Sequence, residues 1–145
     1  MHAVRIGTCG WSYPDWSGVF YPPGLMPANY LSFVADRYSI VEVDSTFYRS
    51  PSIKMVQGWQ DRTPDNFGFS LKVPQTITHE KILKDCGKEV DEFLTAARML
   101  EGKLLCCLLQ FGYFNKKVFA GLDAFLERLN PFLSAWPKDV PADPQ

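Results

Sequence analysis

Two carboxylates and one lysine are spaced so that they could meet at the ends of neighbouring strands. Glu42 and Asp44 are two positions apart in the apolar segment 40–44, which is typical of a β-strand, so their side chains share one face of it. Lys72 lies near the end of a second apolar segment, 67–73. Like charges raise the pKa of one carboxyl, and a nearby ammonium opposes that shift. Such a group can support general acid–base catalysis, so Glu42 and Lys72 are candidate catalytic residues.

Each of these residues also has an interpretation without chemistry. Glu42 can instead belong to a structural ion pair, because ionised groups inside a sheet or barrel can satisfy one another, and Lys72 can be a solvated lysine at a strand end. Arg49 can bind an anion, or it can pair with Glu42 or Asp44. His79 is expected on a loop, and histidine is the residue type suited to proton transfer near neutral pH, although an isolated loop histidine often has no function. Residue types and spacing leave these alternatives open.

Aromatic side chains crowd the loop 10–27, which follows the first apolar segment. Aromatic faces can stack on bases or sugar rings, and they can equally form a small separate core under a long loop. In barrels of alternating strands and helices, sites form at the carboxyl ends of the strands. This rule selects the candidate substrate-binding residues, which are Trp11, Tyr13, Asp44, Tyr48, Arg49 and Gln110.

Four units, each a strand followed by a helix, position these residues. Apolar segments alternate with amphipathic ones at a spacing of about thirty residues, which favours parallel strands joined by helical crossovers. Two architectures fit, namely a small doubly wound sheet and half of a (β/α)₈ barrel, whose full length is about 250 residues. Strands are predicted at 4–9, 40–44, 67–73 and 104–111, and helices at 28–38, from 50 to before 64, at 88–101 and at 116–130.

Composition excludes several classes of protein. The chain has 145 residues with 15 basic and 16 acidic side chains, so it lacks the positive charge of a nonspecific nucleic-acid binder. It has four cysteines without a CxxC pair and only two histidines, which argues against a structural zinc site. The sequence identifies no metal site and no cofactor, and it has no P-loop motif. Without a long apolar run or the pattern of a signal peptide, it is expected to be cytoplasmic and not a membrane protein.

Four ordered motifs resemble those of the YecE-like family, a widespread domain of unknown function. They are IGTCGWSY at 6–13, VEVDSTFYR at 41–49, FSLKVP at 69–74 followed by ITH at 77–79, and the strand that ends in Gln110. The Thr-His pair belongs to the third motif, so the resemblance makes His79 a third candidate catalytic residue. Members of the family often have Asn at the position of Asp44.

The family resembles a complete TIM barrel, so the resemblance implies an α/β fold of four βα units, corresponding to the N-terminal half of a (β/α)₈ barrel. The half barrel is expected at 1–130, and the segment 131–145, with four prolines, is expected to be an irregular tail that frays. A half barrel leaves its first and fourth strands unpaired at the edges, which favours self-association.

Three functional hypotheses follow. The strand-end residues could perform acid–base or metal-assisted chemistry on a polar small molecule or a nucleotide-like ligand. They could instead form a binding module for a base or a sugar without turnover. The chain could also be an inactive fragment of a barrel.

Overall fold

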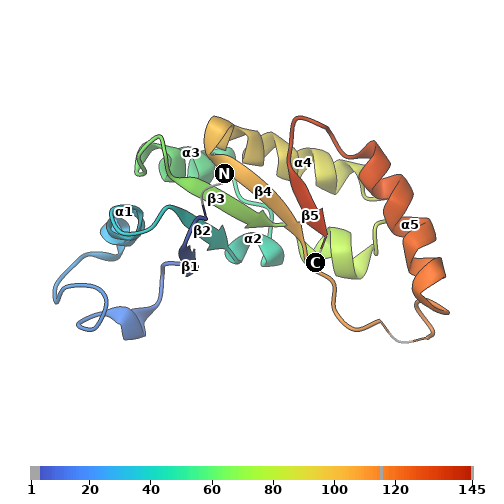
Figure 1. Cartoon of the computed structure of the whole chain (residues 1–145), viewed down its shortest axis with the longest axis horizontal. Helices are drawn as coiled ribbons and strands as arrows, with labels where there is room; N and C mark the ends of the chain where they lie inside the picture. Colours follow the sequence, from blue (N-terminus) through green and yellow to red (C-terminus); the bar gives the residue numbers. More distant parts are fainter. Residues whose placement is uncertain (1–3, 115, 145) are drawn as a thin grey trace.

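Five parallel strands form one open sheet in the order β1-β2-β3-β4-β5, with β1 and β5 at its edges (Figure 1). The computed structural model describes residues 4–114 and 116–144, so positions 1–3 of the predicted domain and position 145 of the predicted tail lie outside the described residues. The four predicted strands are confirmed with shorter bounds, and β5 is additional. The strands are β1 Gly7–Cys9, β2 Ile40–Val43, β3 Gly68–Lys72, β4 Leu104–Leu109 and β5 Ala142–Pro144.

Strand order decides between the two architectures. A doubly wound sheet reverses its order at a switch point, whereas these strands follow one another in chain order. Val41 and Leu71 are fully buried on one face of the sheet, while Glu42 and Lys72 point to the other face and are only half-buried. One covered face and one open face are what half of a (β/α)₈ barrel requires. The predicted α/β fold of four βα units, corresponding to an N-terminal half barrel, is confirmed.

Helices cover the buried face, with α3 and α4 side by side along the sheet in Figure 1. Their inward residues, such as Trp59 on α3 and Phe93 on α4, join Phe69 of β3 in one hydrophobic core. The α-helices are α1 Tyr30–Ala35, α2 Ser45–Tyr48, α3 Ile53–Asp61, α4 Gly87–Ala97 and α5 Leu122–Ala135. Short 3₁₀ helices span Pro14–Trp16, Pro27–Asn29 and Arg98–Lys103, and a π-helix spans Thr76–Glu80.

The start of α3 differs from its predicted position because two nearby serines can each serve as the N-cap residue. The second predicted helix was expected to start at Ser50-Pro51, but the N-cap is Ser52, whose hydroxyl accepts a hydrogen bond from the backbone N–H of Met55 at 3.2 Å. The chain from Asp44 to Arg49 turns through the short helix α2, which has too few residues to show a helical period.

The C-terminal segment is not the irregular tail that was expected from residue 131. Helix α5 continues through Pro131 to Ala135, although proline in a helix interior removes one backbone hydrogen bond. Burial offsets that cost, because Trp136 and Val140 are 8% and 3% exposed. The backbone N–H of Cys107 then donates to the carbonyl of Pro141 at 2.7 Å, and β5 pairs with β4 directly afterwards.

The fourth strand is also less buried than its apolar sequence predicts. Strand β4 ends at Leu109 rather than at residue 111, and its first three residues are only half-buried. Consecutive strand residues alternate between the two faces, so the first half of β4 is incompletely covered on both faces, whereas Cys107, Leu108 and Leu109 are buried on both.

Most aromatic residues of the first loop belong to the main hydrophobic core or pack against it. Tyr21 stacks on Tyr30 with ring centroids 3.8 Å apart, and Phe20 packs edge-on against Phe33 at 5.4 Å. Tyr21 is 1% exposed, so this part of the loop is packing rather than a ligand surface. Phe20 and Tyr21 therefore have a packing role, but they belong to the main hydrophobic core or pack against it, and the expectation of a separate core is wrong for them.

Candidate functional site

Three adjacent strands bring polar residues together on the open face of the sheet. Cys9 at the end of β1 is in register with Glu42 of β2, and Lys72 ends β3 one strand further along. Asp44 follows β2 and is the N-cap residue of α2. The carboxyl ends of parallel strands meet at one edge of the sheet, where sites form in barrels of this type.

The Lys72 ammonium binds both carboxylates. Its Nζ lies 3.2 Å from Oε1 of Glu42 and 2.6 Å from Oδ1 of Asp44. The predicted polar cluster of Glu42, Asp44 and Lys72 is therefore present. In the part of the chain that the structure describes, Arg49 forms no ion pair with Glu42 or Asp44, and Lys72 is the cation that binds them.

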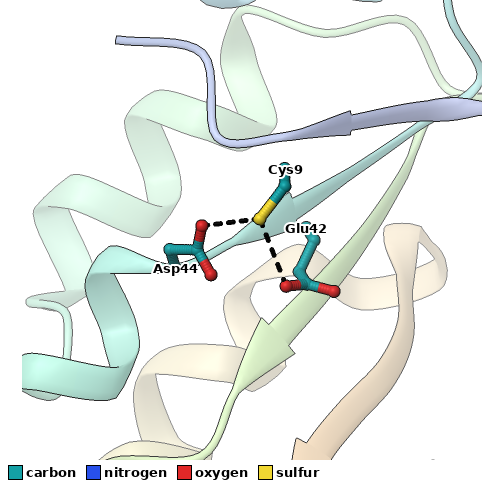
Figure 2. Close-up of side chains that lie close together, drawn as sticks. All are labelled: Cys9, Glu42 and Asp44. Atoms are coloured by element: carbon teal, nitrogen blue, oxygen red, sulfur yellow. Dashed lines mark hydrogen bonds between the residues drawn. The ribbon is translucent and has the colours of Figure 1, made fainter. Parts of the chain in front are cut away.

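The Cys9 thiol is the fourth member of the cluster (Figure 2). Its Sγ lies 2.6 Å from Oδ2 of Asp44 and 3.4 Å from Oε1 of Glu42, with the thiol as the donor. The sequence predicted that Cys9 lies at a strand end, but no local sequence pattern indicates its hydrogen bonds to Glu42 and Asp44, which are 33 and 35 positions away. The register of β1 against β2 could have indicated it, because Cys9 and Glu42 are directly paired.

Opposite charges fix the ionisation of Lys72 and Asp44. Burial lowers the pKa of Lys72, but its hydrogen bonds to Asp44 and Glu42 raise the pKa by a larger amount. The pKa of Lys72 is therefore above its usual value. Burial raises the pKa of the Asp44 carboxyl, yet hydrogen bonds from Cys9 and Lys72 lower it to a net value below the usual one. Both groups are therefore charged at neutral pH.

The same carboxylates keep the Cys9 thiol protonated. Burial and the hydrogen bonds to Asp44 and Glu42 raise the pKa of Cys9 to about 12. The thiolate is the nucleophile in cysteine catalysis, so this environment is the opposite of one that activates a cysteine. Cys9 acts here as a hydrogen-bond donor.

Cys9, Glu42 and Asp44 are also the residues in the described part of the chain that could hold a metal ion together. Their ligand atoms lie within 4.8 Å of one another. A thiolate and two carboxylates would suit a borderline divalent ion such as Zn²⁺. The ammonium of Lys72 already binds both carboxylates and compensates one of their two negative charges.

A cleft of about 310 Å³ lies beside this cluster, between the first loop and the start of α2. Trp11 is held in its wall by an edge-on contact with Trp59 at 5.7 Å. The Tyr13 hydroxyl donates to the backbone carbonyl of Cys9 at 2.9 Å, which ties the cleft wall to the cluster. The cleft thus unites four predicted binding residues, Trp11, Tyr13, Asp44 and Tyr48, with Gly10, Ser12, Val43 and Ser45.

His79 has a different environment. Its Nδ1 lies 2.8 Å from the hydroxyl of Thr78, and its ring packs edge-on against Phe47 at 5.2 Å and near Phe114 at 6.4 Å. Among the described residues, no hydrogen bond or ion pair joins His79 to the Lys72 cluster. The residue predicted from the Thr-His motif is therefore packed beside α2 rather than brought into the cluster.

Two further predicted residues lie apart from the cleft. Arg49 is exposed at the C-terminal end of α2, and Gln110 is exposed directly after β4. Neither lines the cleft beside Asp44.

A second groove, of about 430 Å³, separates α4 from α5. Leu94 of α4 and Phe132 and Trp136 of the C-terminal segment line it, and none of the predicted site residues do. Within residues 4–114 and 116–144, none of the helices has the length and apolar character that a membrane span requires.

Comparisons with known proteins agree with this architecture. The chain is 31% identical over 127 residues to the UPF0759 protein YecE of Escherichia coli K12, an alignment that covers 87% of this chain and 44% of that protein. The UPF0759 protein YunF of Bacillus subtilis is 31% identical over 75 residues, covering 52% of this chain and 26% of that protein. The chain therefore spans less than half of the length of these relatives.

Solved structures show the same partial match. The crystal structure of a DUF72 family protein from Thermotoga maritima aligns with a TM-score of 0.75 and 28% identity, covering 99% of this chain and 56% of that one. A DUF72 family protein from Enterococcus faecalis aligns with a TM-score of 0.67 and 25% identity, covering 97% and 49%. The family model described as "Protein of unknown function DUF72" matches residues 5–142, and the chain belongs to this family.

Proposed function

We propose that the protein binds a small, polar, ring-bearing molecule in the cleft at the carboxyl ends of β1 and β2. One observation carries the proposal: Asp44 belongs both to the cleft and to the charged cluster. Aromatic walls next to a few well-placed polar groups are the usual lining of a small-molecule site, and the cleft is at the lower end of the usual size range.

Binding and orientation suit this cluster better than proton transfer by Asp44 or Lys72. General acids and bases work best when their pKa lies near the working pH. The pKa of Asp44 is lowered and that of Lys72 is raised, so both move away from neutrality. Fixed charges of this kind orient a polar ligand at little cost in reorganisation.

Catalysis by Glu42 is the second candidate function. The Glu42 carboxylate binds the Lys72 ammonium and accepts a hydrogen bond from the Cys9 thiol on the open face of the sheet. From this face, Glu42 could reach a molecule that is bound in the adjacent cleft. Under this alternative Glu42→Gln would abolish turnover while leaving affinity largely unchanged. His79, which was expected on a loop but lies in the π-helix Thr76–Glu80, would act only if that segment moved toward the cleft.

The test is a thermal-shift and calorimetric screen of the whole chain with nucleosides, monosaccharides, primary amines and phosphate esters. We expect at least one class to raise the melting temperature and to lose its effect in Trp11→Ala. Trp136→Phe, a change in the groove between α4 and α5, is the matched control and should keep the effect. Binding that survives Trp11→Ala but not Trp136→Phe would place the site in the other groove and overturn the proposal.

Location and assembly are proposals as well. No disulfide joins the cysteines of the described residues, which suits the reducing cytoplasm, where we place the protein.

Near the β1 edge of the sheet, Val4 and Ile6 are 88% and 67% exposed, and we propose that this edge self-associates. Sedimentation of the wild type and of Ile6→Lys tests it, and a wild-type monomer at all concentrations would contradict it.

A further inference from the structure

We infer that the ligand of the cleft is an organic cation, such as an amidinium or ammonium group on a planar ring, rather than a phosphate or another anion. This inference rests on the proposed binding function and specifies the chemical class of its ligand. It follows from the charges around the cleft and from the nature of its walls.

The cluster beside the cleft carries an excess of one negative charge. Glu42 and Asp44 contribute two carboxylates, and Lys72 supplies one ammonium. The Cys9 thiol donates to the carboxylates and is neutral. A ligand with a single positive charge would therefore neutralise the site.

Lys72, Arg49 and His79 are the basic residues to consider near the cleft, and none of them lines it. Lys72 is engaged by two carboxylates, at 3.2 Å and 2.6 Å. Arg49 follows Tyr48 but is exposed and is not part of the cleft lining, and His79 contacts Thr78 and Phe47. Of the described residues that line the cleft, none is basic, so a phosphate would meet excess negative charge without a donor cation.

The walls favour a cation in a second, independent way. Three of the eight lining residues are aromatic: Trp11, Tyr13 and Tyr48. The faces of aromatic rings attract cations, most strongly for Trp, and also stack on planar rings. Tyr13 and Tyr48 are 38% and 71% exposed, so their rings are accessible to a ligand.

Three probes of nearly equal size and shape separate charge from shape: benzamidinium, benzamide and benzoate. We expect isothermal titration calorimetry to show benzamidinium binding about tenfold or more tightly than benzamide, with no binding of benzoate. Added salt should weaken the binding of benzamidinium but not that of benzamide. The indole N–H resonance of Trp11, assigned with Trp11→Phe, should shift during the titration.

Two variants remove the excess charge in different ways. Asp44→Asn changes the cleft wall, whereas Glu42→Gln removes the same charge from a residue that does not line the cleft. We expect both to lower the benzamidinium preference to about one. Asp15→Asn, an exposed change in the same loop, should keep it, and circular dichroism will show that each variant is folded.

Other outcomes overturn the inference and distinguish it from the proposed function. Equal affinity for benzamide and benzamidinium, or binding of benzoate, with a shift of the Trp11 resonance, refutes a cationic ligand but leaves a binding site in the cleft. No binding of benzamidinium also refutes it, and the wider screen of ligand classes then decides the proposed function separately.

Discussion

The Cys9 thiol lies 2.6 Å from Oδ2 of Asp44, so a cysteine at the solvent-exposed end of one strand is a hydrogen-bond donor to a carboxylate after the next strand. Although part of the Cys9 side chain is exposed, its thiolate is disfavoured by partial burial first and then by the hydrogen bonds to Asp44 and Glu42 and their negative charge. The relationship has consequences for chemistry and for stability that can be measured independently of any ligand.

We expect Cys9 to react slowly with iodoacetamide at pH 8, although it is exposed. Asp44→Asn removes a carboxylate that raises the pKa of Cys9, so the thiolate fraction at pH 8 should rise about tenfold for each unit by which the pKa falls, and the alkylation rate should rise several-fold per unit because a less basic thiolate is also less nucleophilic. Mass spectrometry of the Cys9 peptide measures the rate, with Asp15→Asn as the matched control. A wild-type rate equal to that of free glutathione would contradict the pKa of about 12.

The same thiol makes stability depend on alkaline pH. The folded pKa of Cys9 is raised from 9.0 to about 12, so its contribution to the free energy of unfolding is complete below pH 9 and is lost as pH rises toward 12. Cys9→Ser keeps a donor that does not ionise in this range. Urea denaturation between pH 8 and 10.5 should show the wild type losing stability relative to Cys9→Ser. A constant difference between them would mean that the thiol is not held protonated.

Lys72 should matter more for stability than a lysine in a surface ion pair. Lys72→Met leaves Glu42 and Asp44 adjacent without their cation, and we expect a loss of about 2 kcal/mol at neutral pH, between the values of exposed and buried pairs. Lys81→Met is the matched control, since Lys81 is 40% exposed and binds Glu89 at 2.8 Å; it should cost less than about 1 kcal/mol. Urea denaturation measures both, and equal losses would show that the cluster is not special.

Periodicity was sufficient for the main strands and helices because these bury one regular face. It was not sufficient where the outcome depended on neighbours distant in the sequence. Pro131 suggested a helix end, but burial of Trp136 and Val140 and the pairing of β5 with β4 outweighed it. The sequence also could not predict that Ser52 rather than Ser50 is the N-cap of α3, because serine is a favourable N-cap residue at either position.

The site shows the same division. The spacing of Glu42 and Asp44 and the end position of Lys72 were enough to predict that they meet, because strand alternation and parallel pairing decide it. The role of Cys9 depends on the register of β1 against β2, which no local pattern encodes. The packing of His79 depends on Phe47 of α2 and on Phe114 of the loop after β4, which are distant from His79 in the sequence.

Lys103 holds the end of α3 in place. It is 5% exposed, and its Nζ donates to the carbonyls of Gln60 and Thr63, each at 2.7 Å. Because charged hydrogen bonds of this kind are worth about 1.5–3 kcal/mol, we expect Lys103→Met to cost about 2 kcal/mol or more in urea denaturation. Lys88→Met, on the exposed surface of α4, should change little. Equal effects would mean that the carbonyls of α3 find other donors.

Gly112 sets the position of His79. A Cβ at Gly112 would lie 3.2 Å from Nε2 of His79, which is tighter than ordinary van der Waals contact. Gly112→Ala should therefore displace the imidazole or weaken its contact with Phe47, and change the ring resonances of His79 in NMR spectra. Gly102→Ala is the matched control, because a Cβ there meets nothing within 4 Å. The chain has only two histidines, so His79 can be assigned with a single His79→Gln variant. Unchanged resonances in Gly112→Ala would show that the imidazole is not confined by this loop, and His79 would then be free to swing toward the cleft, as a catalytic role would require.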